Sequence, residues 1–237
     1  MLKEAIQYLV SLKENKTYFF GNDTYSDKEL VRIEKYVPRP KSVEVAGLDS
    51  IVKMIRAEAS KIASPTYILV ESPLEVRVFS ALDDDMKRDG LIRATADVPG
   101  FKNGFLDYQD AIIQLRSKFI QNEDVAYLLD LLSRVNVDNG VTTSDNGVTQ
   151  TVEARSGVSL KTLLNVRPRV TLAPYRTFLE VEQPESEFIL RLDDSARVGL
   201  FEADGGMWKL TAKQSICEYF EEQFSAEIAS GQIVVMM

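Results

Sequence analysis

The stretch PYRTFLEVEQPESEF, from Pro174 to Phe188, contains the carboxylates whose spacing is best suited to chemistry. If it forms a strand, side chains two residues apart point to the same face, so Glu180 and Glu182 lie together. Two carboxylates on one face can hold a divalent metal, as in nucleases. They can equally form salt bridges with Arg176 or Arg191, and the Glu-x-Lys spacing that such nucleases favour is missing. We favour the structural interpretation, and Glu180, Glu182 and Asp204 remain the candidate ligands if a metal binds.

Asp204 belongs to a second stretch, LFEADGGMW, whose two glycines could be taken for a phosphate-binding loop. The stretch has neither the G-x-G-x-x-G spacing of dinucleotide-binding loops nor the G-x-x-x-x-G-K-[ST] spacing of P-loops. It predicts instead a tight turn from a strand into the last helix, with Trp208 packed beneath the turn.

The chain of 237 residues has no histidine and one cysteine, Cys217. The missing histidine excludes Ser-His-Asp and Cys-His nucleophilic catalysis and imidazole metal sites. A single cysteine excludes intramolecular disulfides and Cys-rich zinc sites. Cys217 lies within an apolar helical pattern, which is typical of a buried, inert thiol. We therefore expect no catalytic residue, no cofactor and no bound metal.

The pentapeptide DNGVT occurs twice between Val137 and Val152. An EF-hand calcium loop needs ligands where this sequence has glycine and threonine, so the repeat does not fit one. Asn-Gly pairs supply the positive φ that tight hairpin turns require. We expect one or two polar β-hairpins here. Because the edges of a Val- and Thr-rich hairpin can pair with another subunit, we also expect oligomer contacts at the two Asn-Gly pairs, Asn139, Gly140, Asn146 and Gly147.

The composition is that of a soluble globular protein, with 45% apolar and 27% charged residues and a net charge of −8. The acidic balance argues against binding to nucleic acid or to an anionic membrane. No apolar run approaches the roughly 20 residues that a membrane-spanning helix needs. The opening MLKEAIQYLVSLKEN places acidic residues among short apolar pairs, unlike a secretory signal. We expect a cytoplasmic protein.

Hydrophobic periodicity predicts the elements that would position these residues. Helices are expected over residues 2–14 and 47–63, around 108–119, and from an Asn122 N-cap onward. Strands are expected in TYILVES, SPLEVRVFS and LIRATADV, and short alternating segments follow from about 134 to 201. A last helix is expected from about Thr211, ending at a Gly231 cap.

These elements predict an α+β fold, with an N-terminal mixed α/β half and a C-terminal antiparallel β-rich half closed by a C-terminal helix. The expected boundary lies between residues 1–133 and 134–237. No long Gly/Ser or Pro-rich linker separates the halves, so we expect them to pack as one unit.

Five stretches of the sequence are distinctive as a set: YILVESPLEVRVFSAL, FIQNEDVAYLL, DNGVTQ, TLAPYRTFLEVEQPESEF and LFEADGGMWKL. Together they resemble a family of phage and prophage proteins common in Gram-positive bacteria and, more distantly, the YfdQ-like prophage family. The likeness runs from about Thr24 to Phe224. The resemblance implies a phage-encoded, non-secreted protein of the bacterial host cytoplasm, and it implies no catalytic residues.

Two functions follow. The first is a non-enzymatic phage accessory protein that acts by self-assembly as a homo-oligomer, or by binding another phage or host protein. The alternative is a magnesium-dependent nucleic-acid-processing or nucleotide-binding protein of early phage replication that uses Glu180, Glu182 and Asp204.

Overall fold

The computed structural model describes residues 2–11, 16–20, 23–26, 38–62, 64–134, 141–145, 150–156, 160–193, 195 and 197–237. Its contacts divide the chain into an N-terminal unit, Met1–Arg39, and a main unit, Pro40–Met237. In the N-terminal unit, helix α1 (Leu2–Ser11) precedes an antiparallel hairpin of β1 (Thr17–Phe20) and β2 (Asp23–Ser26). No residue of α1 is buried.

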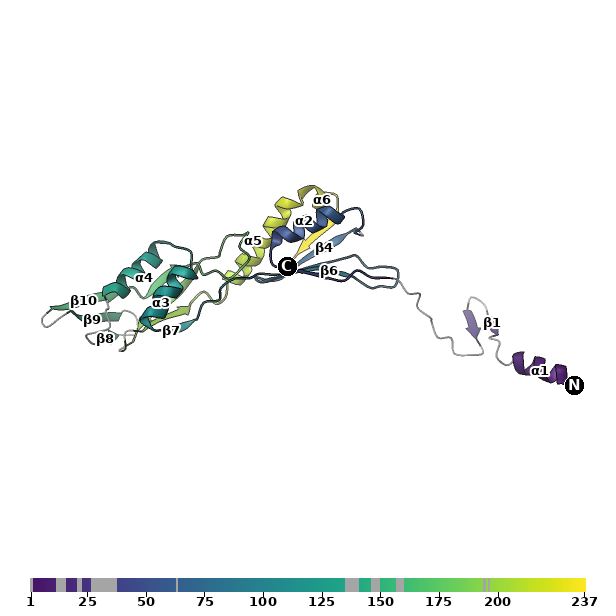
Figure 1. The fold of residues 1–237 in the computed structure, drawn as a ribbon, viewed down its shortest axis with the longest axis horizontal. Coiled ribbons are helices and arrows are strands. Elements are labelled where there is room, and N and C mark those ends of the chain that lie inside the picture. The colour runs from purple at the N-terminus through teal and green to yellow at the C-terminus, as the bar shows by residue number, and fades with distance from the viewer. Residues whose placement is uncertain are drawn as a thin grey trace. The chain divides into compact units, whose positions relative to one another are not determined.

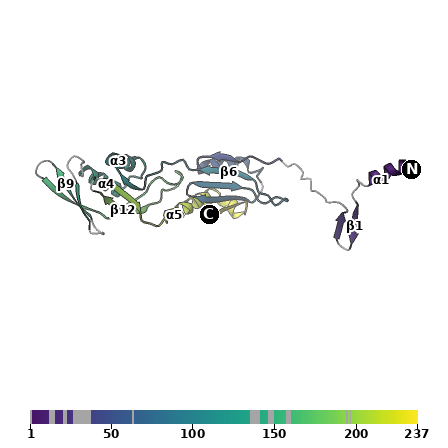
Figure 2. The ribbon, with the colours of Figure 1, turned by 90° about the horizontal axis from the view of Figure 1, so that it is seen from below.

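The main unit contains a five-stranded sheet covered on one face by helices (Figures 1 and 2). The strands are, in sheet order, β14 (Ile233–Met236), β4 (Thr66–Ser72), β5 (Glu75–Phe79), β6 (Gly90–Thr95) and β3 (Val43–Val45). The helices are α2 (Leu48–Glu58), α5 (Trp208–Gln223) and α6 (Ser225–Ala229). Figure 2 shows the strands toward the viewer and the helices behind them.

Alternation along the strands decides which side chains this sheet buries. In β4 the side chains of Thr66, Ile68 and Val70 are buried, whereas those between them are partly exposed, as expected for a sheet covered on one face. Helix α2 buries Leu48, Ile51, Val52 and Ile55, which lie at helical spacing, against the same face. This hydrophobic cluster, which also includes Ile216 and Phe220 of α5, is called the α2 core.

A second, four-stranded sheet is antiparallel throughout and packs against two helices. Its strands are, in sheet order, β11 (Arg169–Leu172), β12 (Ser186–Leu192), β13 (Val198–Glu202) and β7 (Gly104–Leu106). The helices are α3 (Tyr108–Ser117) and α4 (Glu123–Arg134). Their shared cluster, here called the α4 core, includes Leu115, Leu128, Leu132, Phe188 and Leu190.

The described residues between α4 and β11 form a three-stranded antiparallel sheet in the order β10 (Leu160–Val166), β9 (Gln150–Ser156) and β8 (Val141–Asp145). The buried Gln150 side chain joins it to β12, because its Oε1 accepts from Leu192 N at 2.8 Å and its Nε2 donates to Leu192 O. The β8–β9 pairing agrees with the hairpin expected near the DNGVT repeat. The four candidate contact residues, Asn139, Gly140, Asn146 and Gly147, lie outside the described residues.

The expected α+β fold is confirmed, and so are its helix signals. Asn122 Oδ1 accepts from Val125 N at 2.9 Å, as an N-cap does. Gly231 has a φ of +74°, the left-handed conformation of a helix C-cap. The last long helix begins three residues before the expected Thr211, at Trp208. The single helix that was expected to run to Gly231 is divided at Phe224 into α5 and α6. The chain then continues into β14, which the sequence patterns did not predict.

Both cores draw residues from either side of residue 133, where the sequence patterns placed a boundary. The α4 core joins Leu106 to Leu200, and the α2 core joins Leu48 to Ile233. This happens because β14 pairs with β4 and β7 pairs with β13. In the described part of the chain no helix is both long and apolar enough to cross a bilayer.

Candidate functional site

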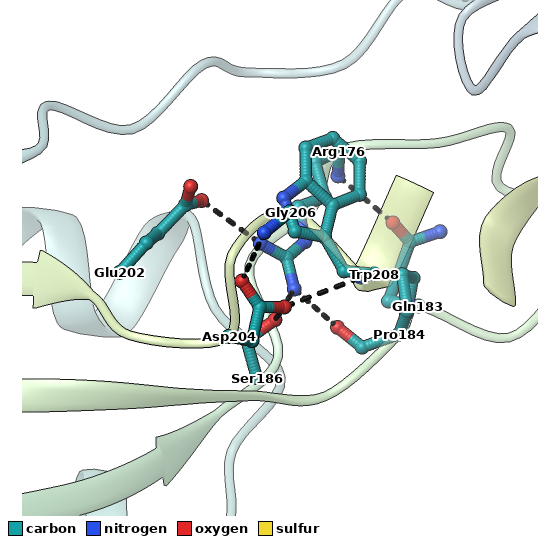
Figure 3. A network of polar contacts seen from close by, with 8 residues as sticks. All are labelled: Arg176, Gln183, Pro184, Ser186, Glu202, Asp204, Gly206 and Trp208. Atoms are coloured by element: carbon teal, nitrogen blue, oxygen red, sulfur yellow. Dashed lines mark hydrogen bonds and ion pairs between the residues drawn. The ribbon is translucent and has the colours of Figure 1, made fainter. Parts of the chain in front are cut away.

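A dense group of polar contacts surrounds Arg176, in the loop that follows β11 (Figure 3). Its Nη1 donates to Glu202 Oε1 at 3.0 Å, and its Nη2 donates to Pro184 O at 2.9 Å and to Ser186 Oγ. Its guanidinium carbon lies 4.1 Å from the centre of the Trp208 ring, a cation–π arrangement. We call this group the Arg176 cluster; its members are Arg176, Gln183, Pro184, Ser186, Glu202, Asp204 and Trp208.

The guanidinium of Arg176 is almost fully buried, with 6% of the residue exposed. Burial lowers the pKa of Arg176 to about 10, although Glu202 and Asp204 favour its charged form. The side chain therefore stays protonated at neutral pH. A buried charge is tolerated only when partners replace the water it has lost, so these contacts hold the arginine in one geometry. Two buried donors, Arg176 Nε and Trp208 Nε1, have no acceptor among the described residues.

Asp204 organises the turn that leads into α5. Its Oδ1 accepts from Gly206 N at 2.9 Å, and its Oδ2 accepts from Ser186 Oγ at 2.6 Å and from Trp208 N at 3.2 Å. Burial alone raises the pKa of Asp204, but these hydrogen bonds lower it by more, so the carboxylate is held below its usual range. Asp204 therefore satisfies backbone donors where α5 begins, which explains why the helix starts before Thr211.

The Gln183 side chain forms hydrogen bonds with the backbone of the loop before β12. Its Oε1 accepts from the backbone N–H groups of Arg176 and Thr177, at 2.9 and 3.1 Å. Its Nε2 donates to the carbonyls of Thr177, Phe178 and Val181. Because this side chain replaces a neighbouring strand as the partner of the backbone, the loop stays irregular without leaving these buried groups unpaired.

The strand interpretation of the 178–182 segment is therefore wrong: residues 179–181 form a turn. Glu180 and Glu182 do not share a strand face, and each lines a different cavity. Glu180 lies beside Gly47 and Asp97, whereas Glu182 lies beside Tyr175. Arg176 pairs with Glu202 and not with either glutamate.

Glu180 lies at the amino end of α2, where its Oε1 accepts from Asp49 N at 3.4 Å. A Cβ atom at Gly47 would lie 2.4 Å from the same oxygen, so this glycine leaves the space that the carboxylate uses. A negative charge is favourable at a helix amino end. Glu180 therefore has a structural role of its own, separate from Glu182.

A contact between α2 and α5, which the sequence patterns did not indicate, joins Tyr219 and Asp49. The Tyr219 hydroxyl donates to Asp49 Oδ1 at 2.6 Å. Burial, followed by this hydrogen bond and the charge of Asp49, raises the pKa of Tyr219. The same hydrogen bond lowers the pKa of Asp49. Cys217, on the same helix, is partly buried beside the α2 core, and burial raises the pKa of its thiol.

The Arg176 cluster joins the two hydrophobic cores. Glu202 ends β13 of the second sheet, and Trp208 begins α5, which reaches the α2 core. The two residues that follow Arg176 complete the connection between the cores. Thr177 Oγ1 donates to Pro73 O at 2.7 Å in the β4–β5 turn, and Phe178 is buried in the α2 core. The cluster therefore fixes the position of one core against the other.

The candidate metal ligands are not assembled in the described part of the chain. Asp204 belongs to the Arg176 cluster, whereas Glu180 and Glu182 lie at the two cavities. No group of three or more Asp, Glu or Cys side chains there is placed to hold a metal ion. Sequence patterns missed Arg176, Gln183 and Ser186 as a group. The sequence does offer a signal for this group: its hydrogen-bonding residues lie between Pro174 and Pro184 or directly after Pro184.

Comparisons with protein-family models, with curated proteins and with solved structures found no match to this chain.

Proposed function

We propose that this chain is a non-enzymatic accessory protein, encoded by a phage, that acts in the bacterial cytoplasm by self-assembly or by binding another macromolecule. The observation that supports the proposal is that the polar side chains of the Arg176 cluster bind one another and the backbone around them. In the Arg176 cluster the carboxylates of Glu202 and Asp204 and the hydroxyl of Ser186 are bound to groups of the same chain. Their contacts fasten two cores together, which suits a rigid scaffold.

The phage origin rests on the resemblance of TLAPYRTFLEVEQPESEF and LFEADGGMWKL to phage and prophage proteins. These two stretches supply all members of the Arg176 cluster. Two of the five stretches that carry the resemblance therefore supply the cluster that joins the two cores. In a scaffold of this kind the cluster maintains the shape of the protein and does not have to catalyse a reaction.

The test is the mass of the full chain by light scattering at micromolar concentration, paired with a magnesium-dependent nuclease screen. Self-assembly predicts a mass that is a multiple of the 26.7 kDa chain. A monomer would refute the self-assembly part of the proposal. A magnesium-dependent hydrolysis that disappears in the Glu180→Ala, Glu182→Ala double variant, with the fold intact, would refute its non-enzymatic part.

A further inference from the structure

A cavity of about 150 Å³ opens at one end of the α2 core, between the carboxyl end of α2, helix α6 and the first residues of β4 and β14. Every residue that lines it belongs to the main unit. Its walls are largely apolar and are formed by Ile55, Ala59, Ile62, Phe224 and Ile233. Apolar walls with a few polar groups at the opening are typical of sites that bind small molecules.

The volume of the cavity limits the group that can enter it. A cavity of roughly 150 Å³ lined by aliphatic and aromatic side chains holds a molecule as large as benzene. A branched aliphatic group, such as the side chain of an apolar amino acid, is of similar size or smaller. Ile55, Phe224 and Ile233 are themselves buried, so an aliphatic group that enters the cavity leaves water for an apolar environment, which is favourable.

Two side chains of opposite charge line the same cavity, Arg56 of α2 and Glu227 of α6. Within the described part of the chain they form no ion pair, either with each other or with another residue. Opposite charges elsewhere in the main unit do pair, as Arg77 does with Glu75 at 2.8 Å. Arg56 and Glu227 are therefore left to receive the two charges of a ligand between them.

Arg56 is held in place at the cavity by its own contacts. Its Nη2 donates to Gln223 O at 2.8 Å, and its guanidinium carbon lies 5.7 Å from the centre of the Phe224 ring. Its Nε and Nη1 donate to no acceptor among the described residues. These two nitrogens can donate to a carboxylate, and their position is set before a ligand arrives, which lowers the entropic cost of binding.

We infer that this cavity binds a small zwitterion with an apolar side chain, namely an aliphatic α-amino acid such as leucine. The side chain occupies the apolar cavity, the carboxylate accepts from Arg56, and the ammonium group donates to Glu227. A simple carboxylic acid or a simple amine would engage only one of the two charges. The site shares no residue with the Arg176 cluster, and the inference does not depend on the proposed self-assembly.

The first test is calorimetric titration of the full chain with leucine and three control ligands. Asparagine has the same charged head and a side chain of similar shape that is polar. Isocaproate has the side chain and the carboxylate of leucine without the ammonium group, and isoamylamine has the side chain and the ammonium group without the carboxylate. We expect leucine to bind and each control to bind about 10-fold more weakly or worse, because each loses a charge-assisted hydrogen bond or places a polar group against apolar walls.

The second test uses variants of the lining residues. Ala59→Leu fills the cavity and should abolish leucine binding. Its matched control, Ala57→Leu, adds the same side chain to an exposed residue of α2 that does not line the cavity, and should bind leucine as the wild type does. Arg56→Met and Glu227→Gln should each weaken binding about 10-fold. Lys53→Met, which removes an exposed cation of the same helix outside the cavity, should not.

Several results would overturn the inference. The absence of leucine binding to the wild type would do so, as would binding that survives in a folded Ala59→Leu variant, because the ligand would then lie elsewhere. Isocaproate that binds as tightly as leucine would overturn the role of Glu227, and asparagine that binds as tightly would overturn the role of the apolar walls. If Ala59→Leu is unfolded by circular dichroism, Arg56→Met and Glu227→Gln decide, and unchanged affinity in both overturns the site. A monomeric chain that binds leucine would refute self-assembly and support this inference.

Discussion

Replacing Arg176 by methionine tests whether the Arg176 cluster fastens the two cores. Methionine keeps an unbranched side chain against Trp208 but removes the charge and all of the donors. The variant loses the 3.0 Å ion pair with Glu202 and leaves Pro184 O without its donor. Ser186 keeps its hydrogen bond to Asp204. The perturbation is therefore confined to the contacts that the guanidinium makes.

The size of the effect follows from burial. Removing one partner of a buried ion pair costs about 3–5 kcal/mol, because the other charge is left uncompensated. The Glu202 side chain is 27% exposed and can regain some water, so the lower end applies. We expect Arg176→Met to reduce the free energy of unfolding by about 3 kcal/mol, which in a chain of this size lowers Tm by about 6–12 °C. Arg176→Lys keeps the charge without the planar fork, so its free energy of unfolding should lie between those of the wild type and Arg176→Met.

Thermal and urea unfolding, followed by circular dichroism and by the emission of Trp208, would measure this loss. Trp208 is the only tryptophan and lies against Arg176, so its emission reports on the cluster itself. Arg169→Met is the matched control. Arg169 pairs with Glu187 at 2.8 Å, but these side chains are 63 and 41% exposed, and such pairs contribute less than about 1 kcal/mol. Equal, small losses in the two variants would refute the role assigned to Arg176.

Two further predictions concern pH and a helix cap. Hydrogen bonds from Arg93 and then Arg77 lower the pKa of Glu75 to about 2, so its contribution to stability is complete above the pKa of an unfolded glutamate and is lost as pH falls toward 2. Urea midpoints should therefore fall less steeply between pH 6 and pH 2.5 in Glu75→Gln than in the wild type, and parallel curves would contradict this. Gly231→Ala should cost about 1 kcal/mol because its φ of +74° strains any side chain, whereas Gly100→Ala, in open space, should cost little; equal unfolding midpoints would count against the strain.

Sequence alone determined the features that depend on neighbours along the chain. Periods of 3.6 and 2 identified α2, α4 and β4, and the Asn122 and Gly231 caps were correct, because capping is decided within a few residues. The absence of histidine excluded whole classes of chemistry without any structure.

Tertiary structure decided the features that join distant residues. Arg176 reaches Glu202, 26 residues away, and Thr177 reaches Pro73, 104 residues away; no local period encodes either contact. Glu180 and Glu182 are on separate cavities because Gln183, and not a neighbouring strand, binds the backbone of their loop. Local patterns determine which segments can form a helix or a strand. The partner of a buried polar group depends instead on how the sheets and helices pack against one another, and that is settled only when the whole chain folds.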